Sequence, residues 1–376
     1  MNNWRLDIPK DDDWNGDTEM NLNVWYTHLG HLASTAMEAA GLIHERSWPV
    51  QLRLNGGNRA LQNQQQSWGW FIHLQPAGSE YLKLRRPLDS GGNLYKKVRP
   101  HQNFTVRESA PGVPSASGYL SDGWLKNSNE GLNDWRDLNG LMTTFRGATA
   151  PTVPQMDAVI NLDYWLRWLA FQTIVNHNET NLSNGSNDDY GLYRGEVDPR
   201  FIPLAHDFDT VWGQGGNTSS ADPTSPTATV YQVTGNFSNG GERIGALAPL
   251  YTNPESNQRF KAQMVDLLGT VFLPANFNAM VDNTLGNWGG PGGGVSVSAR
   301  DNIKNFNATR RDYILRAVLG YDAAGQPPAV LTAGTNLPVQ SGYPRTTTAN
   351  ATGLSGTVDS SRVRKLLVGG VEVLPD

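Results

Sequence analysis

The chain has 376 residues and a formal net charge of −5, without any block of basic residues. This length fits one large domain or two ordinary ones. The charge argues against nucleic acid and against a strongly anionic membrane as partners. Cysteine is absent, which excludes thiol catalysis and disulfide bonds. No apolar run approaches the roughly 18 residues of a membrane-spanning helix, so we expect no membrane span.

The N-terminus does not have the pattern of a signal peptide, since it reads "MNNWRLDIPKDDDWNG". From this we expect either a cytoplasmic protein or a fragment of a longer one. The 40 glycines, together with many Asn, Thr and Ser residues, give a loop-rich composition that weakly favours an exported protein.

In the first part of the chain, residues 24–40 are apolar at helical spacing and are followed by Gly41, which predicts a helix that ends at a glycine cap. The segment "PVQLRLNGG" alternates like a strand and ends in an Asn-Gly turn. "SWGWFIHL" predicts the hairpin partner of that strand. A short helix, "SEYLKLRR", and a strand, "GGNLYKKV", are expected next.

The strongest helix prediction covers 156–176, and its apolar residues Leu162, Trp165, Leu166 and Leu169 share one face. A polar loop follows, and then two short strands are joined by a turn that contains Asp198 and Pro199. Helices are expected at 255–270, 273–285 and 298–318, and residues 329–376 alternate as short strands. These elements predict an α+β fold with a small all-β C-terminal segment.

The order helix, polar loop, acid, hairpin, acid predicts a site for a divalent cation. A hairpin returns the chain, so that Asp207 and Asp209 arrive beside the acid that precedes the first strand. Mg²⁺ takes one or two carboxylates with waters and phosphate oxygens. Phosphoryl transfer needs mainly positioning and neutralised charge. The alternatives are that the Asp-x-Asp is a surface turn and that His206 has only a structural role.

Three segments resemble the spore-coat protein H (CotH) kinase family of bacterial proteins, namely "LDYWLRWLAFQTIVNHNET", "DDYGLYRGEVDPRF" and "IPLAHDFDTVWGQG". "PVQLRLNG", "GGNLYKK", "MVDNTLGNW" and "ARDNIKNFNATRRDYILRAV" are similar to further family segments, so the resemblance spans roughly residues 4 to 320. The tail resembles the start of a β-sandwich module that often follows in large exported proteins.

The resemblance implies a two-lobed, atypical protein-kinase-like fold and ATP-dependent phosphorylation of protein Ser or Thr with Mg²⁺ or Mn²⁺. Residues 1–150 would form a strand-rich lobe, 151–320 a helical lobe and 329–376 a β-rich tail. Asp207 matches the metal-binding acid, with Asp209 beside it, and Asp189 stands where the family usually has a second metal-ligand Asn. Lys96 matches the phosphate-contacting lysine, although Lys97 is adjacent and Lys96 could be an ordinary surface lysine.

The sequence departs from the family pattern in three places. Asn178 stands where the catalytic Asp is expected, and Asn cannot act as a general base, whereas the neighbouring Glu179 can. Gln75 stands where the family often has a Glu that would pair with the lysine. A preceding strand with a turn that would face the phosphates is missing, so the N-terminal lobe is expected to be truncated.

Three functions follow from these residues. The first is an exported or cell-surface kinase-like transferase that acts on a Ser/Thr-rich protein or on neighbouring domains of its own chain. The second is a catalytically weak or inactive kinase-like scaffold or adhesion module of a large surface protein, which Asn178 and Gln75 favour. The third is a metal-dependent phosphohydrolase, which the absence of a His cluster disfavours.

Overall fold

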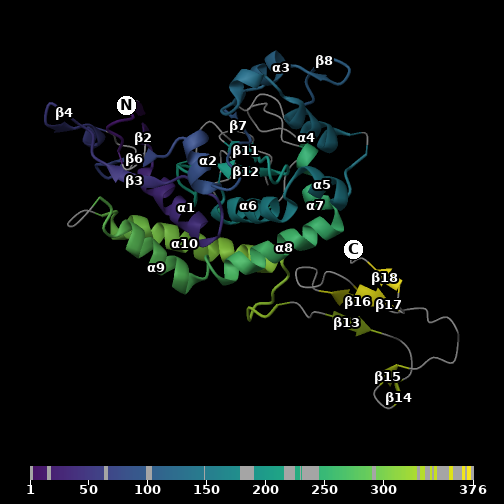
Figure 1. Cartoon of the computed structure of the whole chain (residues 1–376). Helices are drawn as coiled ribbons and strands as arrows, with labels where there is room; N and C mark the ends of the chain where they lie inside the picture. The colour runs from purple at the N-terminus through teal and green to yellow at the C-terminus, as the bar shows by residue number, and fades with distance from the viewer. Residues whose placement is uncertain are drawn as a thin grey trace.

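The computed structural model describes residues 3–14, 18–62, 67–98, 104–147, 149–177, 190–215, 225–228, 230, 245–289 and 294–327, together with short strands of the tail. Helices and strands are mixed along this chain, as the α+β prediction requires (Figure 1). Among the described residues, no helix by itself has the length and hydropathy to cross a bilayer. Helices α8 (Pro254–Gly269) and α9 (Pro274–Leu285) reach this length and this hydropathy only when they are taken together, and that pair is bent by 63°.

The first sheet is antiparallel, and its strand order is β1 (Trp4–Asp7), β2 (Glu19–Asn23), β6 (Phe71–Leu74) and β3 (Ser47–Val50). The predicted pairing of β3 with β6 is confirmed. Asn55 and Gly56 both have positive φ in the turn between β4 (Arg53–Leu54) and β5 (Gly57–Asn58), as the Asn-Gly signal indicated. Helix α1 (Thr27–Ala39) packs on β3 and β6 and is followed by Gly41 at φ +69°.

The second sheet has the order β10 (Trp124–Lys126), β7 (Asn93–Lys97), β11 (Tyr190–Arg194) and β12 (Phe201–Ala205), with each neighbouring pair antiparallel. The predicted hairpin of β11 and β12 is therefore confirmed. The sheet takes strands from both sides of residue 150, and the main hydrophobic core also spans that position. The division into lobes at residue 150 and the kinase-like arrangement of two lobes stay predictions.

Of the shorter elements of the first half, α3 packs on β10 of this second sheet. Helix α2 lies between the two sheets in sequence, and α3 and α4 follow β7. Their bounds, with those of the remaining short elements, are η1 (Arg59–Gln62), α2 (Ser79–Arg85), β8 (Glu108–Ala110), β9 (Val113–Pro114), α3 (Ala116–Ser121), η2 (Glu130–Leu132) and α4 (Arg136–Arg146).

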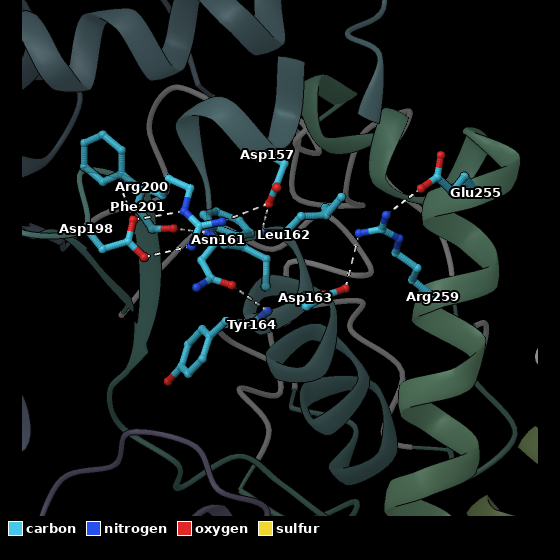
Figure 2. Close-up of polar contacts among 11 residues, drawn as sticks. Asp157, Asn161, Leu162, Asp163, Tyr164, Asp198, Arg200, Phe201, Glu255 and Arg259 are labelled. Atoms are coloured by element: carbon cyan, nitrogen blue, oxygen red, sulfur yellow. Dashed lines mark hydrogen bonds and ion pairs between the residues drawn. The ribbon is translucent and has the colours of Figure 1, made fainter. Parts of the chain in front are cut away.

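The helix that we predicted over 156–176 is wrong as a single element, because α5 (Val153–Val159) and α6 (Leu162–Val175) are separate. Ile160 is extended and bridges Phe201, and the N–H of Asn161 donates to the Phe201 carbonyl at 3.0 Å. The Asn161 side chain then accepts from the Tyr164 N–H at 3.2 Å and caps α6 (Figure 2). The contact with Phe201 of β12 thus interrupts the helix between α5 and α6.

Helix α6 has an exposed first turn at Asp163, but from Trp168 to its end every residue is buried, and it forms the centre of the core. It lies between the second sheet and the C-terminal helices α8 and α10 (Val297–Tyr313), as Figure 1 shows. Figure 2 also shows Arg259 of α8 between Asp163 and Glu255, at 3.5 and 2.5 Å. The predicted helices near 255–270, 273–285 and 298–318 are confirmed, the last one continuing as a π-helix over Ile314–Val318.

Short elements complete the chain. They are η3 (Gly245–Leu247), α7 (Pro249–Thr252), β13 (Leu331–Gly334), β14 (Val339–Gln340), β15 (Tyr343–Pro344), β16 (Ser355–Val358), β17 (Leu366–Val368) and β18 (Val371–Val373). The six tail strands pair as β13 with β16, β14 with β15, and β17 with β18. A β-sandwich module in this tail stays a prediction.

Candidate functional site

Strand β7 presents its two lysines to opposite faces of the second sheet, because side chains alternate along a strand. Lys97 is fully buried, donates to the carbonyl of Asp122 and lies over the Trp124 ring. Lys96 points instead into a cavity of about 580 Å³. Of these two adjacent lysines, Lys96 is therefore the one that a ligand in this cavity could reach.

Lys96 belongs to a chain of polar contacts with His206 and Glu45. Its Nζ lies 2.8 Å from His206 Nε2, and His206 Nδ1 lies 2.8 Å from Glu45 Oε1. An ammonium has only donors, so this contact requires the neutral ring, with Nε2 as the acceptor and Nδ1 as the donor to Glu45. Burial lowers the pKa of His206, but the Glu45 carboxylate more than offsets this and moves that pKa above its ordinary value. A proton added to the ring would push Lys96 away.

Asp207 follows His206 directly and adopts a left-handed backbone with φ +54°. Its Oδ1 accepts from Asn23 Nδ2 at 3.1 Å, and its carbonyl lies 3.0 Å from His177 Nε2. Burial and the Glu45 carboxylate raise the pKa of Asp207, while His206 and Lys96 oppose the rise. A cation bound beside such a half-buried carboxylate would stabilise its ionised form.

Asp209 is the second acid of the Asp-x-Asp, and a tight turn fixes the backbone around it. Gly215 has φ +76°, and a Cβ at that position would lie 1.8 Å from the Asp209 carbonyl oxygen. Only glycine fits there. Phe208, between the two acids, is buried and stacks on His177, with ring centroids 4.6 Å apart. The aromatic residue anchors the segment in the core, and the acids on either side of it are half-buried.

The cavity in front of Lys96 is polar and lies between the two sheets. Besides Lys96 and His206, its lining includes Gln75, Tyr81, Asn127 and Glu130. Gln75, only 2% exposed, therefore shares a cavity with Lys96 as the family pattern suggests, but the hydrogen-bond partner of Lys96 is His206. A volume near 580 Å³ falls within the usual range for small-molecule sites.

Three predicted residues, Asn178, Glu179 and Asp189, lie outside the described residues. The start of their loop is described, since Asn176 has φ +50° and His177 Nδ1 lies 2.8 Å from Gln172 Oε1. The other His177 nitrogen contacts the Asp207 carbonyl, so the loop leaves α6 beside Asp207. His177, which directly precedes Asn178, therefore lies next to Asp207, the candidate metal ligand.

The sequence also matches the model of a family described as CotH kinase protein over residues 3–291. The chain belongs to the CotH kinase family. No curated protein matches the chain. The matched range contains every described residue of the site, from Asn23 to Asp209, and ends before the β-rich tail.

The CotH kinase assignment raises the question of whether the acids fit a divalent cation. Within the described residues, no group of three or more His, Asp or Glu side chains could hold a metal by itself. The donor set is Asp207, with Asp209 two positions further on. That set suits Mg²⁺ or Mn²⁺ that arrives with phosphate oxygens and water as its remaining ligands, rather than a metal held by the chain alone.

Sequence reasoning missed three residues of this CotH kinase site. Glu45, 6% exposed at its side chain, supplies the negative charge next to His206, and Asn23 and His177 hold Asp207. Glu45 lies in an irregular segment between α1 and β3 and has no local pattern. Asn23 is the last residue of β2 and His177 lies two positions after α6, which is a weak signal. His206 was considered only as a structural residue, and it lines the cavity.

Proposed function

We propose that this CotH kinase chain is an ATP- and divalent-metal-dependent phosphotransferase that acts on Ser or Thr of proteins. The observation that carries the proposal is the placement of Lys96. It lies in the large polar cavity and contacts His206, the residue directly before Asp207. A cation for phosphates thus contacts the residue next to an acid for a metal at the end of β12, while Asp207 itself does not line the cavity. Kinases use this pair of groups to bind the phosphates of the nucleotide.

In this proposal the nucleotide occupies the 580 Å³ cavity, with its phosphates toward Lys96. Asp207 would hold Mg²⁺ or Mn²⁺, with Asp209 and Asp189 as further acids, and the bound cation would neutralise phosphate charge. Glu45 and His206 hold Lys96 at the phosphates in the way that an acidic partner holds the lysine of ordinary kinases. Glu45 then supplies the negative charge that the family's Glu would provide at the position of Gln75.

The proton of the substrate hydroxyl needs an acceptor next to the phosphates. Asn178 cannot accept it as a base, whereas Glu179 carries the basic oxygen and has a side chain one methylene longer than Asp. His177 fixes the chain just before these residues beside Asp207. We assign the role of general base to Glu179 and a neighbouring, non-basic role to Asn178.

The second candidate function is an inactive kinase-like scaffold or adhesion module. The observation that favours it is Asn178 at the position of the family's catalytic acid. In both cases we propose an exported or cell-surface protein whose partner is a Ser/Thr-rich protein or a neighbouring domain of a longer chain. The C-terminal strands, as a β-sandwich module, would be such a domain.

Nucleotide binding and phosphotransfer together test the proposal. We expect ATP with Mn²⁺ or Mg²⁺ to raise the melting temperature in a saturable way, and ATP with a chelator to have little effect. Radiolabelled phosphate should then appear in a Ser-rich peptide or in the chain itself. Binding without transfer would favour the scaffold, and the absence of both would overturn the nucleotide site. Lys96→Met is the matched control, because it removes only the ammonium.

A further inference from the structure

A second cavity, of about 300 Å³, lies between helices α1 and α2 at the start of β3. Its lining includes the guanidinium-bearing residues Arg46 and Arg85 and two histidines, His31 and His44. Glu45 also lines it, and the same Glu45 contacts His206 in the first cavity. Lys96 and Asp207 do not line it, so this cavity is separate from the proposed nucleotide site.

Arg85 has donors that the protein leaves without acceptors. Its Nε and Nη2 are buried, and neither has a hydrogen-bond partner among the described residues. A buried donor without a partner costs about 1–3 kcal/mol, and more when the group is charged. Guanidinium groups are normally paired with carboxylate or phosphate in a two-pronged arrangement. Both nitrogens are covered in this conformation, so they become available to a ligand only if the Arg85 side chain turns into the cavity that it lines.

A second cation increases the need for an anion in this cavity. Burial lowers the pKa of Arg85 and the nearby Arg46 guanidinium lowers it further, while Tyr81 and Glu38 partly oppose this change. Arg46 is held over the Trp48 ring, with its Cζ 5.9 Å from the ring centroid. Two like charges that face one small space repel each other, and an oxyanion between them would relieve this repulsion.

Among the described residues, neither acid of the cavity forms an ion pair with Arg46 or Arg85. Glu45 is engaged by His206, and the Glu38 side chain is 74% exposed, with Oε2 3.9 Å from His44 Nε2. Burial lowers the pKa of His31 to about 4 and also lowers that of His44. Both rings are therefore neutral near pH 7, where they can offer an N–H without adding charge.

We propose that the cavity bounded by Arg46 and Arg85 binds a phosphate-class oxyanion, either free phosphate or a phosphorylated side chain. Arg85, turned into the cavity, would donate to two of the oxygens, and Arg46 would complete the charge neutralisation. The inference does not depend on the proposed kinase activity, because none of its contacts involves Lys96, Asp207 or a nucleotide.

The test uses the whole chain and inorganic phosphate as the probe, in a buffer free of other oxyanions. We expect phosphate to raise the melting temperature in a saturable way, in excess of the effect of sodium chloride at equal ionic strength. Arg85→Gln should weaken phosphate binding by roughly tenfold or more, since it removes the charged fork. Arg46→Gln should weaken it less. Lys83→Gln is the matched control, because it removes a positive charge from an exposed position of α2.

Two further arms separate the sources and the sites. Lys96→Met should keep the response to phosphate, whereas a lost response would mean that phosphate binds in the first cavity and would overturn the inference. A phosphoserine peptide that binds more tightly than phosphate would identify a phosphorylated side chain, and equal or weaker binding would identify the free ion. A wild-type response no larger than that of Arg85→Gln would show that only water occupies the cavity, and would also overturn the inference.

Discussion

Lys96 and His206 are 110 positions apart in the sequence, yet Nζ of the lysine lies 2.8 Å from Nε2 of the histidine. The contact joins β7 to the end of β12, two strands of the second sheet that are separated by β11. Glu45, from outside this sheet, completes the chain on the other side of the ring. The orientation of Lys96 therefore depends on a carboxylate that it does not contact.

Glu45→Gln tests this dependence. The amide keeps the shape and one acceptor but can also donate, so it no longer fixes the ring tautomer whose Nε2 accepts from Lys96, and Lys96 should be held less firmly. We expect metal–nucleotide affinity to fall roughly threefold to tenfold, about 1 kcal/mol, by isothermal titration. Glu38→Gln, an exposed acid of α1, is the matched control. Equal affinities for Glu45→Gln and the wild type would remove Glu45 from the site.

Asp207→Asn tests the metal acid with the least disturbance. The position has φ +54°, which Asn tolerates far better than Ala does, and Asn can still accept from Asn23. We expect loss of Mn²⁺-dependent nucleotide binding, while Asp209→Asn weakens that binding less. The melting temperature without ligands should change little in either variant. Unchanged nucleotide affinity in Asp207→Asn would contradict the metal role.

Local sequence patterns predict the positions of most elements, but they do not predict which residues come together in the site. The spacing of apolar residues located α1, α8, α9 and α10, and alternation located the β11–β12 hairpin, because both signals lie within a few turns of chain. The break at Asn161 was missed, since it depends on the docking of Phe201 from a strand 40 positions further on. Glu45 was missed for the same reason, as its partner is 161 positions away.

Strand alternation could have separated Lys96 from Lys97 without a structure. Alternation puts Tyr95 and Lys97 on one face of β7, where both are fully buried, and puts Lys96 on the other face together with Leu94, which is also fully buried. The sequence alone could not tell which face borders a cavity, because that depends on β1, β2 and β6 of the other sheet. Family resemblance supplied Asp207, whose Asp-x-Asp pattern is also common in plain turns.

Arg310 is a buried cation that holds the start of the candidate catalytic loop. Its guanidinium donates to the carbonyl of Thr173, near the end of α6, at 3.1 and 2.9 Å, and also to Pro226 and Ala228. We expect Arg310→Met to lower the free energy of unfolding by about 2–4 kcal/mol, because buried carbonyls lose their donors. Urea unfolding measures this. Arg316→Met, at an exposed residue of the same helical region, should cost less than about 0.5 kcal/mol.

His31 should make stability depend on pH. Burial lowers its folded-state pKa to about 4, below the ordinary value of 6.5. Between these values the unfolded chain binds a proton that the folded chain does not, so stability falls as the pH drops from 6.5 toward 4. In His31→Gln the loss of stability between pH 7 and pH 5 should be smaller by about 2 kcal/mol. Urea unfolding in phosphate-free buffers measures it, and identical pH profiles would contradict the assignment.

The loop after α6 decides between an enzyme and a scaffold. If Glu179 is the base, it must come within about 3 Å, or one water, of a substrate hydroxyl. Glu179→Gln should then abolish phosphotransfer and leave ATP binding intact, since the change keeps the shape and removes the basic oxygen. Asn178→Asp should raise activity if the site is a degraded kinase. Both substitutions change one polar loop residue and should leave the folded chain stable.

The measurement is phosphate incorporation into a Ser-rich peptide and into the chain itself, with Mg²⁺ and with Mn²⁺. Nucleotide affinity is measured on the same preparations, which separates a lost base from a lost binding site. A wild type that transfers phosphate and a Glu179→Gln variant that does so equally well would remove Glu179 as the base. If the wild type transfers no phosphate and Asn178→Asp gains no activity, the scaffold remains as the function. In that case neither Glu179 nor an Asp at position 178 acts as a general base beside the proposed nucleotide site.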